Sequence, residues 1–371
     1  MKTSTISSVF AAACALATPG SIHAAIEVDG TSIEAVDMHL HPGRFGQMPQ
    51  SAVEFLTAAI PGPARLFSPV LFERLLDPYA EHVGGLEQTK MAGVDHAVLL
   101  AVYTHHTSGY FTNEQLEEAL TDPRNVSADP RPDRARWAWG MVSIDFFDGY
   151  LDPGVPESRL AAVESYFERR RDLFIGIKLA HAHQAVAFDD SRYLGVYDVA
   201  AKYGVPVLLH TGFSPFPNSQ SDPAYYDPQG LEAVITNYDG QHGLPRVNFV
   251  LAHTGQGDAR SLAHALALAQ QHDNVYLELS ALKRPLLIDE SGQAVTATDF
   301  QYPYVLAEVR ARGLVHRTLW STDGPQYSGM VRRYLDLLVE GMKSAGYTVD
   351  EIAAVLSGNF YALYFANSTP A

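Results

Sequence analysis

The sequence almost lacks cysteine and is poor in basic residues. Its 371 residues include one cysteine, Cys14, and 26 lysines and arginines against 42 acidic residues, giving a formal net charge of −16. With a single thiol the chain can form no internal disulfide, and cysteine ligands cannot build a metal site. The diffuse acidic balance disfavours nucleic acid as a partner, because phosphate contacts need clustered Lys and Arg. A small-molecule substrate stays open, since a local pocket can carry the opposite charge.

Long apolar runs are also missing, so no membrane span is expected. A spanning helix needs about 20 apolar residues, and the run at 6–17 is too short. That run follows a lysine and precedes a Pro-Gly pair and an Ala-Ala pair, a pattern typical of a secretory signal peptide. We therefore expect residues 1–25 to be removed and residues 26–371 to form a single, cysteine-free domain in the periplasm or outside the cell. An N-terminal helix of that domain is the alternative.

What the chain does contain is a short apolar strand pattern, repeated, with helical patterns in between. Eight runs have strand length and apolar, β-branched character: 34–40, 95–103, 137–144, 173–180, 205–210, 247–253, 274–280 and 317–323. Helical spacing of apolar residues is clearest at 157–171, 259–272, 302–313 and 330–346. This alternation predicts an α/β fold of the (β/α)8 TIM-barrel class. A doubly wound sheet is the alternative, but HLHPGRFG after the first strand lacks the form of a glycine-rich phosphate turn.

Two connections are unusually long. They are 43–69 after strand one and 213–229 after strand five, the latter rich in Pro, Ser, Asp and Tyr. Loops of this length usually bind ligands or cover a site. In a barrel both would rise from the face where the strands end.

Polar side chains stand at the ends of several predicted strands. The first strand ends in DMHLH, so alternation predicts that Asp37, His39 and His41 share one face. Two imidazoles at this spacing form a natural chelate. Strands five and six both end in His-Thr-Gly, at His210 and His253. Because the carboxyl ends of barrel strands meet at one mouth, these imidazoles are expected to face one centre.

Two further strands contribute charged groups to the same mouth. Strand four ends near Lys178 and strand eight at Asp323. Three or four imidazoles with one carboxylate suit Zn²⁺, and Mn²⁺ or Fe²⁺ are alternatives. An open coordination position would supply hydroxide at neutral pH. The sequence thus predicts a divalent metal centre with one or two ions.

Several strand motifs resemble those of the amidohydrolase superfamily. They are VDMHLHP, GIKLAHAH, VLLHTG, VLAHTG and LWSTDGP, and the closing LSGNFYALYF resembles the amidohydrolase-related branch. The resemblance runs from about 34 to 365. It implies that the metal ligands are His39, His41, His210 and Asp323. For His253 it implies either a ligand of a second metal or an acid–base role.

The resemblance gives Lys178 three possible roles. In members of the superfamily with two metals, a lysine on strand four is carboxylated and bridges the ions. The alternatives are a contact with a substrate carboxylate and a structural pair with Glu278. The branch includes aminocarboxymuconate-semialdehyde decarboxylase, resorcylate decarboxylases and pyrone-dicarboxylate lactonase. Because those decarboxylases have no lysine on this strand, Lys178 favours a different reaction.

The resemblance therefore implies a metal-dependent hydrolase in which metal-bound hydroxide attacks an ester, lactone or amide of a small polar or aromatic substrate. Asp323 would bind metal and take the proton of the attacking water, and His253 would polarise the scissile carbonyl. The loop residues expected to contact the substrate are Arg44, His105, His106, His181 and Lys283.

Other functions stay open at this point. The main alternative is a metal-dependent decarboxylase acting on an aromatic or unsaturated carboxylic acid. A binding protein with a structural metal and a phosphotriesterase-like enzyme with two metals are further alternatives. The sequence also leaves a homo-oligomer open.

Overall fold

The computed structural model describes residues 26–58, 82–127, 134–146, 155–192, 194–242, 244–282, 302–324 and 328–366, together with 129, 131, 289, 291 and 293. The expected signal peptide, residues 1–25, and the expected substrate contact Lys283 lie outside these residues and stay predictions. The loop predicted at 43–69 is described only as far as residue 58. In the described part of the chain, no helix is both long and apolar enough to cross a bilayer.

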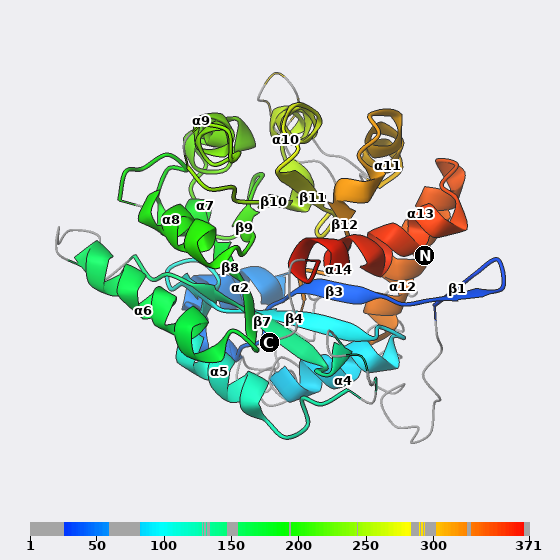
Figure 1. Cartoon of the computed structure of the whole chain (residues 1–371), viewed down its shortest axis with the longest axis horizontal. Helices are drawn as coiled ribbons and strands as arrows, with labels where there is room; N and C mark the ends of the chain where they lie inside the picture. Colours follow the sequence, from blue (N-terminus) through cyan, green and yellow to red (C-terminus); the bar gives the residue numbers. More distant parts are fainter. Residues whose placement is uncertain are drawn as a thin grey trace.

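Eight parallel strands form a barrel in which each strand pairs with its neighbour along the chain (Figure 1). They are β3 (Val36–Leu40), β4 (His96–Leu100), β7 (Ala138–Ser143), β8 (Phe174–Leu179), β9 (Val207–His210), β10 (Phe249–Ala252), β11 (Val275–Glu278) and β12 (Thr318–Leu319). A parallel bridge between Leu40 and Gly324 joins the first strand to the chain just after the last. The predicted (β/α)8 TIM barrel is confirmed.

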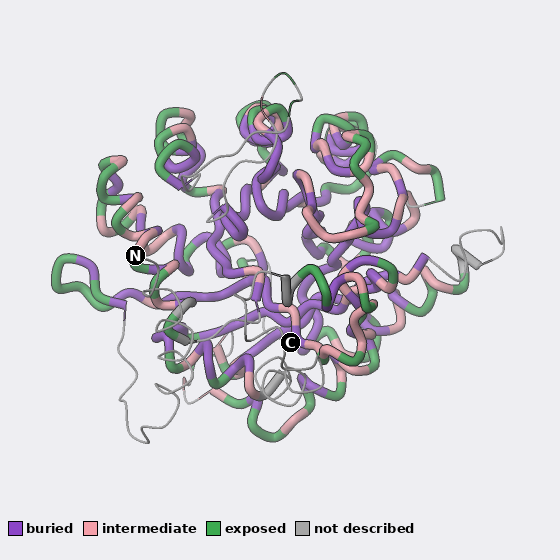
Figure 2. Tube along the Cα trace, turned by 180° about the vertical axis from the view of Figure 1, so that it is seen from behind, coloured by how far each residue is buried: buried purple, intermediate pink, exposed green. Residues whose placement is uncertain are grey.

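The barrel strands are buried on both faces, as their near-continuous apolar runs predict. Apart from the half-buried Tyr276, every residue in the eight strands is buried (Figure 2). A polar side chain at the end of such a strand therefore lies in a site of low solvent access. This placement gives a charged or hydrogen-bonding group there a strong influence on its neighbours.

Helices surround the strands. Their bounds are α2 (Gln50–Ala58), α4 (His82–Met91), α5 (Asn113–Thr121), α6 (Val155–Arg170), α7 (His181–Gln184), α8 (Leu194–Tyr203), α9 (Glu232–Asn237), α10 (Ala259–Gln271), α11 (Tyr302–Ala311), α12 (Ser328–Ser344), α13 (Val349–Ala353) and α14 (Asn359–Tyr364). The four helices predicted from apolar spacing are α6, α10, α11 and α12. Left-handed glycines follow α11 and α12, Gly313 with φ 70° and Gly346 with φ 81°, as is common at helix C-termini.

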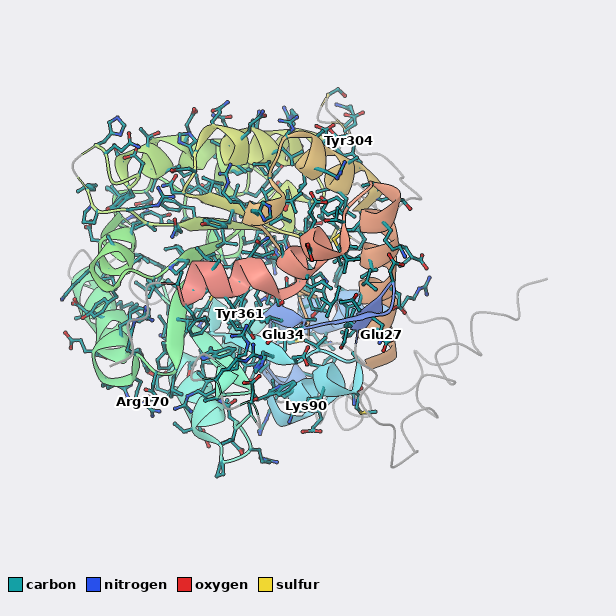
Figure 3. All side chains as sticks on the ribbon, turned by 45° about the vertical axis from the view of Figure 1, so that its right-hand side comes forward. Glu27, Glu34, Lys90, Arg170, Tyr304 and Tyr361 are labelled. Carbon is teal, nitrogen blue, oxygen red and sulfur yellow. The ribbon has the colours of Figure 1, made fainter. Side chains whose placement is uncertain are left out.

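Helix α14 closes the end of the barrel opposite the site. Phe360, Tyr361 and Tyr364 pack with the inward-facing residues of the strands, among them Trp139. The Tyr361 hydroxyl donates to Glu34 Oε1 at 2.7 Å, just before β3 begins (Figure 3). This apolar plug keeps water out of the barrel interior below the mouth.

Three local details differ from the sequence prediction. An antiparallel hairpin, β1 (Ile26–Val28) and β2 (Thr31–Ile33), precedes the barrel; its Asp-Gly turn was a recognisable hairpin signal. The predicted strand 95–103 is divided, because β5 (Val102–Thr104) pairs with β6 (Gly109–Phe111) instead of the barrel. The predicted strand 317–323 ends early at Leu319.

Replacing Phe360 by Ala is expected to lower the free energy of unfolding by about 3–5 kcal/mol, because the side chain is 2% exposed and fills the closed end of the barrel. Urea unfolding measures the change. Tyr304→Ala on α11 is the control, since that side chain is 55% exposed (Figure 3) and its loss should change stability by about 0.5 kcal/mol or less. Equal losses in the two variants would contradict the role given to α14.

Candidate functional site

Six predicted ligand residues come together at the carboxyl end of the barrel. We call His39, His41, Lys178, His210, His253 and Asp323 the ligand cluster. His39 Nε2 lies 3.0 Å from His41 Nε2 and 3.2 Å from Lys178 Nζ. Asp323 Oδ1 lies 3.7 Å from His39 Nε2 and 3.5 Å from His41 Nε2. These four side chains come from the ends of β3, β8 and β12.

The two His-Thr-Gly corners supply the remaining imidazoles. His253 Nε2 lies 3.1 Å from His210 Nδ1, and the His253 ring centroid is 5.1 Å from that of His39. Ligand atoms of His39, His253 and Asp323 all lie within 4.8 Å of one another. Side chains that are far apart in the sequence therefore form one continuous group of nitrogen and oxygen atoms.

The threonines and glycines of these corners explain why the same trio occurs twice. Thr211 Oγ1 donates to Ala252 O at 2.7 Å and accepts from Gly255 N at 3.0 Å, which ties the two corners together. Gly212 has φ 88°, and a Cβ there would lie 2.2 Å from a backbone oxygen. Gly255 has φ 71°, and a Cβ would lie 2.3 Å from Ser261 O. Only glycine permits backbone segments to approach this closely.

Two ligand residues themselves have left-handed backbones. His253 has φ 65° and Asp323 has φ 56°. Such a conformation costs a non-glycine residue about 1–3 kcal/mol and is common at functional sites, where the surrounding structure holds it in place. His253 directly follows β10, so its turn in the backbone comes where the chain leaves the strand, whereas Asp323 lies four residues beyond the end of β12.

Glu278, at the end of β11, accepts hydrogen bonds from the residues around the cluster. Oε2 accepts from His39 Nδ1 at 3.2 Å, His253 N at 3.0 Å and Ser280 Oγ at 2.8 Å. Oε1 accepts from Ser280 N at 2.6 Å and from Ser321 Oγ. Burial raises the pKa of Glu278, and the hydrogen bonds from Ser321, Ser280 and His253 oppose this shift because they stabilise the carboxylate. Sequence reasoning assigned Glu278 no function of its own, although it is the charged residue at the end of a buried strand.

These hydrogen bonds fix the tautomers of three imidazoles. His39 donates through Nδ1 to Glu278, and His253 Nδ1 lies 2.6 Å from Ser280 Oγ, whose own proton goes to Glu278. His210 Nε2 donates to Gly212 O at 3.2 Å. A neutral imidazole carries one proton. The lone pairs therefore lie on His39 Nε2, His253 Nε2 and His210 Nδ1.

The arrangement of these lone pairs fits a divalent cation. His253 Nε2 and His210 Nδ1 face each other at 3.1 Å with no proton assigned between them, and unshared lone pairs at that distance repel. A cation between them would turn the repulsion into coordination. Imidazole nitrogens with a carboxylate are ligands that Zn²⁺, Mn²⁺ and Fe²⁺ accept. The side chains placed to hold one are His39, His41, His210, His253 and Asp323.

Burial favours the uncharged forms of the basic groups in the cluster. It lowers the pKa of His41 to about 4 and that of His210 well below its usual value. It also lowers the pKa of Lys178 to about 8, although the charges of Asp323 and Glu278 oppose the change. Neutral imidazoles are the form that binds metal.

Asp37 does not share a role with the two histidines that follow it. The register of β3 against β4 shifts between Asp37 and Leu40, so strict alternation from Asp37 to His41 does not hold. The Asp37 carboxylate accepts from Thr322 N at 3.0 Å, Thr322 Oγ1 at 2.6 Å and His39 N at 3.3 Å. It therefore ties β3 to the segment after β12, and the carboxylate that contacts the His39 imidazole is that of Glu278.

Three of the predicted substrate contacts lie in loops around the mouth. Arg44 is exposed in the loop after β3. His105 Nε2 lies 3.5 Å from Asp145 Oδ2. His106 is exposed, and its carbonyl accepts from Asn218 Nδ2 of the long loop after β9 at 3.0 Å. Their contact with a substrate stays a prediction.

The fourth, His181, is a buried residue of the short helix α7. Its Nδ1 lies 3.1 Å from Val186 O, and its ring centroid is 4.6 Å from that of Phe188. It is 0% exposed. These contacts hold the turn after α7 together. Two residues further on, His183 is also buried, and its ring lies against His210 with centroids 4.9 Å apart; sequence reasoning did not select it.

A family model described as amidohydrolase matches residues 36–366. The chain belongs to the amidohydrolase family. The match spans all eight barrel strands and the whole ligand cluster. A comparison of this amidohydrolase with curated proteins finds no match.

Solved structures share the fold of this amidohydrolase at low sequence identity. An uncharacterised TIM-barrel protein from Bordetella bronchiseptica has a TM-score of 0.59 and 15% identity, over 89% of this chain and 98% of that one. A probable 2-pyrone-4,6-dicarboxylic acid hydrolase from Acinetobacter baumannii has a TM-score of 0.53 and 14% identity, over 90% of this chain and 99% of that one. The 5-carboxyvanillate decarboxylase of Sphingomonas paucimobilis has a TM-score of 0.54 and 14% identity, over 90% of this chain and 99% of that one. Such identities show the fold alone.

Glu278→Gln is expected to weaken metal binding by about 10- to 100-fold, because an amide cannot accept all five hydrogen bonds and would free the imidazoles of His39 and His253 to rotate. Titration of the metal-free protein with Zn²⁺ against a competing chelator measures the affinity. Ser321→Ala removes a donor to the same carboxylate at the other oxygen and should weaken binding much less. Wild-type affinity in Glu278→Gln would contradict the orienting role.

Proposed function

We propose that this amidohydrolase is a metal-dependent hydrolase of an ester, lactone or amide in a small polar or aromatic substrate. The observation that supports the proposal is the pair of facing imidazole nitrogens of His210 and His253, with the ligand atoms of His39, His253 and Asp323 within 4.8 Å of one another. The ion we propose is Zn²⁺, with Mn²⁺ or Fe²⁺ as alternatives. When bound, a divalent cation activates water for attack and polarises the carbonyl under attack.

Asp323 is the residue we propose as the acid–base group. Its Oδ1 lies within 3.7 Å of both imidazoles of the first strand, and its side chain is partly accessible at 16%. It can therefore take the proton of an attacking water and pass it to the leaving group. The φ of 56° keeps the carboxylate directed into the mouth during both transfers.

His253 and Lys178, which both lie beside His39, are proposed to act on the substrate. Hydrogen bonding at Nδ1 to Ser280 directs His253 Nε2 into the cluster. From there it can bind a metal or stabilise the developing oxyanion beside it. Lys178 Nζ, 3.2 Å from His39 Nε2, is placed either to become a carboxylated ligand of a second ion or to pair with a substrate carboxylate.

Decarboxylation of an aromatic or unsaturated acid is the second candidate. Solved structures with a similar fold include 5-carboxyvanillate decarboxylase and 2,6-dihydroxybenzoate decarboxylase with its substrate, alongside the probable pyrone-dicarboxylic acid hydrolases. Lys178 favours hydrolysis over decarboxylation, because the decarboxylases of the related branch have no lysine on this strand. A panel of aryl esters, lactones and anilides, run beside carbon dioxide release from hydroxybenzoates, distinguishes the two reactions.

Asp323→Asn is expected to lower kcat on the best panel substrate by about 10²- to 10⁴-fold, because an amide cannot take the proton. Circular dichroism should show a retained fold. Asp336→Asn is the control, since that carboxylate on α12 is exposed and pairs only with a helix neighbour, Arg332, among its described contacts. Retained activity in Asp323→Asn would remove Asp323 from the mechanism.

The number of ions per chain tests the role of Lys178. Protein purified without chelator should contain about two ions per chain if Lys178 is carboxylated, and Lys178→Ala should then lower the ratio to about one. Elemental analysis against protein concentration gives the ratio, and intact-mass measurement under native conditions detects the added carboxylate. A ratio near one that Lys178→Ala does not change would exclude the carboxylated ligand and leave the substrate contact and the structural pair.

A further inference from the structure

His183 is a fourth buried imidazole beside the ligand cluster. It lies on α7, directly after β8, and is 8% exposed. Its ring meets that of His210 edge-on, with centroids 4.9 Å apart, and lies 6.3 Å from that of Phe216. Lys178, His41 and Asp323 are close enough for their charges to act on its pKa. His183 therefore faces the same space as the proposed metal ligands.

The hydrogen bonds at Nδ1 determine where its proton lies. Thr107 Oγ1 is 2.7 Å from His183 Nδ1, and the threonine proton is directed at Thr104 O, 3.3 Å away. Ser219 Oγ, 3.5 Å from the same nitrogen, donates to Ser214 Oγ at 3.2 Å. Both hydroxyls beside Nδ1 are therefore acceptors toward it. Nδ1 carries the proton, and Nε2 carries the lone pair.

No partner reaches that lone pair within the part of the chain that the structure describes. The ring makes its hydrogen-bond contacts with Thr107 and Ser219 through Nδ1. His183 Nε2 is not one of the buried side-chain atoms that lack a partner, so it is open to solvent from the mouth. A ligand that offers a proton at this position would take the place of water there.

The loop after β9 covers this position. Asn218 Nδ2 donates to His106 O at 3.0 Å, and Gln220 N donates to Ala182 O at 2.9 Å. These bonds fasten the loop to the ends of two other barrel segments, across the mouth. The loop also carries Phe216, whose ring centroid is 5.3 Å from that of Phe55 on α2. A flat apolar ring can lie against this aromatic pair while its substituent reaches the imidazole.

We propose that His183 is a specificity-determining residue whose Nε2 accepts a hydrogen bond from a phenolic hydroxyl of the substrate. The inference rests on the proposed hydrolase site and narrows its substrates to hydroxylated aromatic compounds. The neighbours of His183 at Nδ1 are the hydroxyls of Thr107 and Ser219, which orient the ring with Nε2 directed away from them. The imidazole is thereby kept as an acceptor for a neutral donor.

Binding of hydroxybenzoates tests this proposal without requiring turnover. The probes are 2-, 3- and 4-hydroxybenzoate, each compared with its methyl ether, which keeps the ring and carboxylate but has no phenolic proton. Calorimetric titration of the metal-loaded protein is expected to show at least one hydroxybenzoate binding about tenfold more tightly than its ether. If the wild-type protein distinguishes none of the three pairs, the proposal is overturned.

Two variants of His183 separate its two nitrogens. His183→Asn keeps a donor near Nδ1 for Thr107 but has nothing at the position of Nε2, so the discrimination should be lost. His183→Gln places an amide oxygen near Nε2 and should recover part of it. His264→Asn on α10 is the matched control, because that imidazole is also held at Nδ1 by an oxygen, from Asp227, and lies outside the ligand cluster. It should keep the wild-type discrimination.

Metal content decides between a substrate contact and a ligand. His183→Asn is expected to keep the wild-type number of ions per chain, and a fall in that number would overturn the proposal by making His183 a ligand. Undiminished discrimination in His183→Asn would overturn it as well. Failure of every ester, lactone and anilide in the turnover panel would refute the hydrolase proposal but would leave this binding result unaffected.

Discussion

The site depends on one constraint: the buried imidazoles of His210 and His253 are held with their lone pairs facing each other, and His39 Nε2 lies in the same mouth beside His41 Nε2 and Lys178 Nζ. Each ring donates its single N–H proton on the side away from the cluster. His39 donates to Glu278, His253 to Ser280 and His210 to Gly212 O. In water such rings would turn and form hydrogen bonds with solvent. In a buried mouth they cannot, and a divalent cation is the partner that suits all of them together. Glu278 holds two of these rings, one directly and one through a serine.

The barrel makes this arrangement possible because it brings the ends of distant strands to one face while the opposite end is sealed by α14. Each corner also contributes strain or close packing. Gly212 and Gly255 allow backbone segments to approach so closely that no side chain would fit between them. The left-handed backbones of His253 and Asp323 turn their side chains inward. The free energy lost in these conformations is offset by the burial of the strands around them.

The sequence predicts the barrel and most of the ligand cluster for a simple reason. Each apolar run carries its polar residue at its end, and parallel strands bring those ends together, so His210, His253 and Asp323 needed no tertiary information. Features that depend on local irregularity were not accessible in this way. The register shift in β3 separates Asp37 from the histidines that follow it. The function of Glu278 depends on its neighbour Ser280 and on Ser321, His39 and His253, which other segments bring to it.

The side-chain directions in the short helix α7 were also not predictable from the sequence pattern. In KLAHAHQ the two histidines look alike, yet one turn of helix sends His181 toward Phe188 and His183 toward His210. Periodicity cannot assign those directions in a four-residue helix. The Asp-Gly turn of the first hairpin, by contrast, was readable from local turn chemistry alone.

The most direct test of the account is an anomalous diffraction map of crystals grown with Zn²⁺, measured on both sides of the zinc absorption edge. We expect a peak at the barrel mouth within about 2.0–2.2 Å of three ligands. They are a nitrogen of His39, a nitrogen of either His210 or His253, and an oxygen of Asp323. A zinc peak only elsewhere, with these side chains left facing one another and no ion among them, would contradict it.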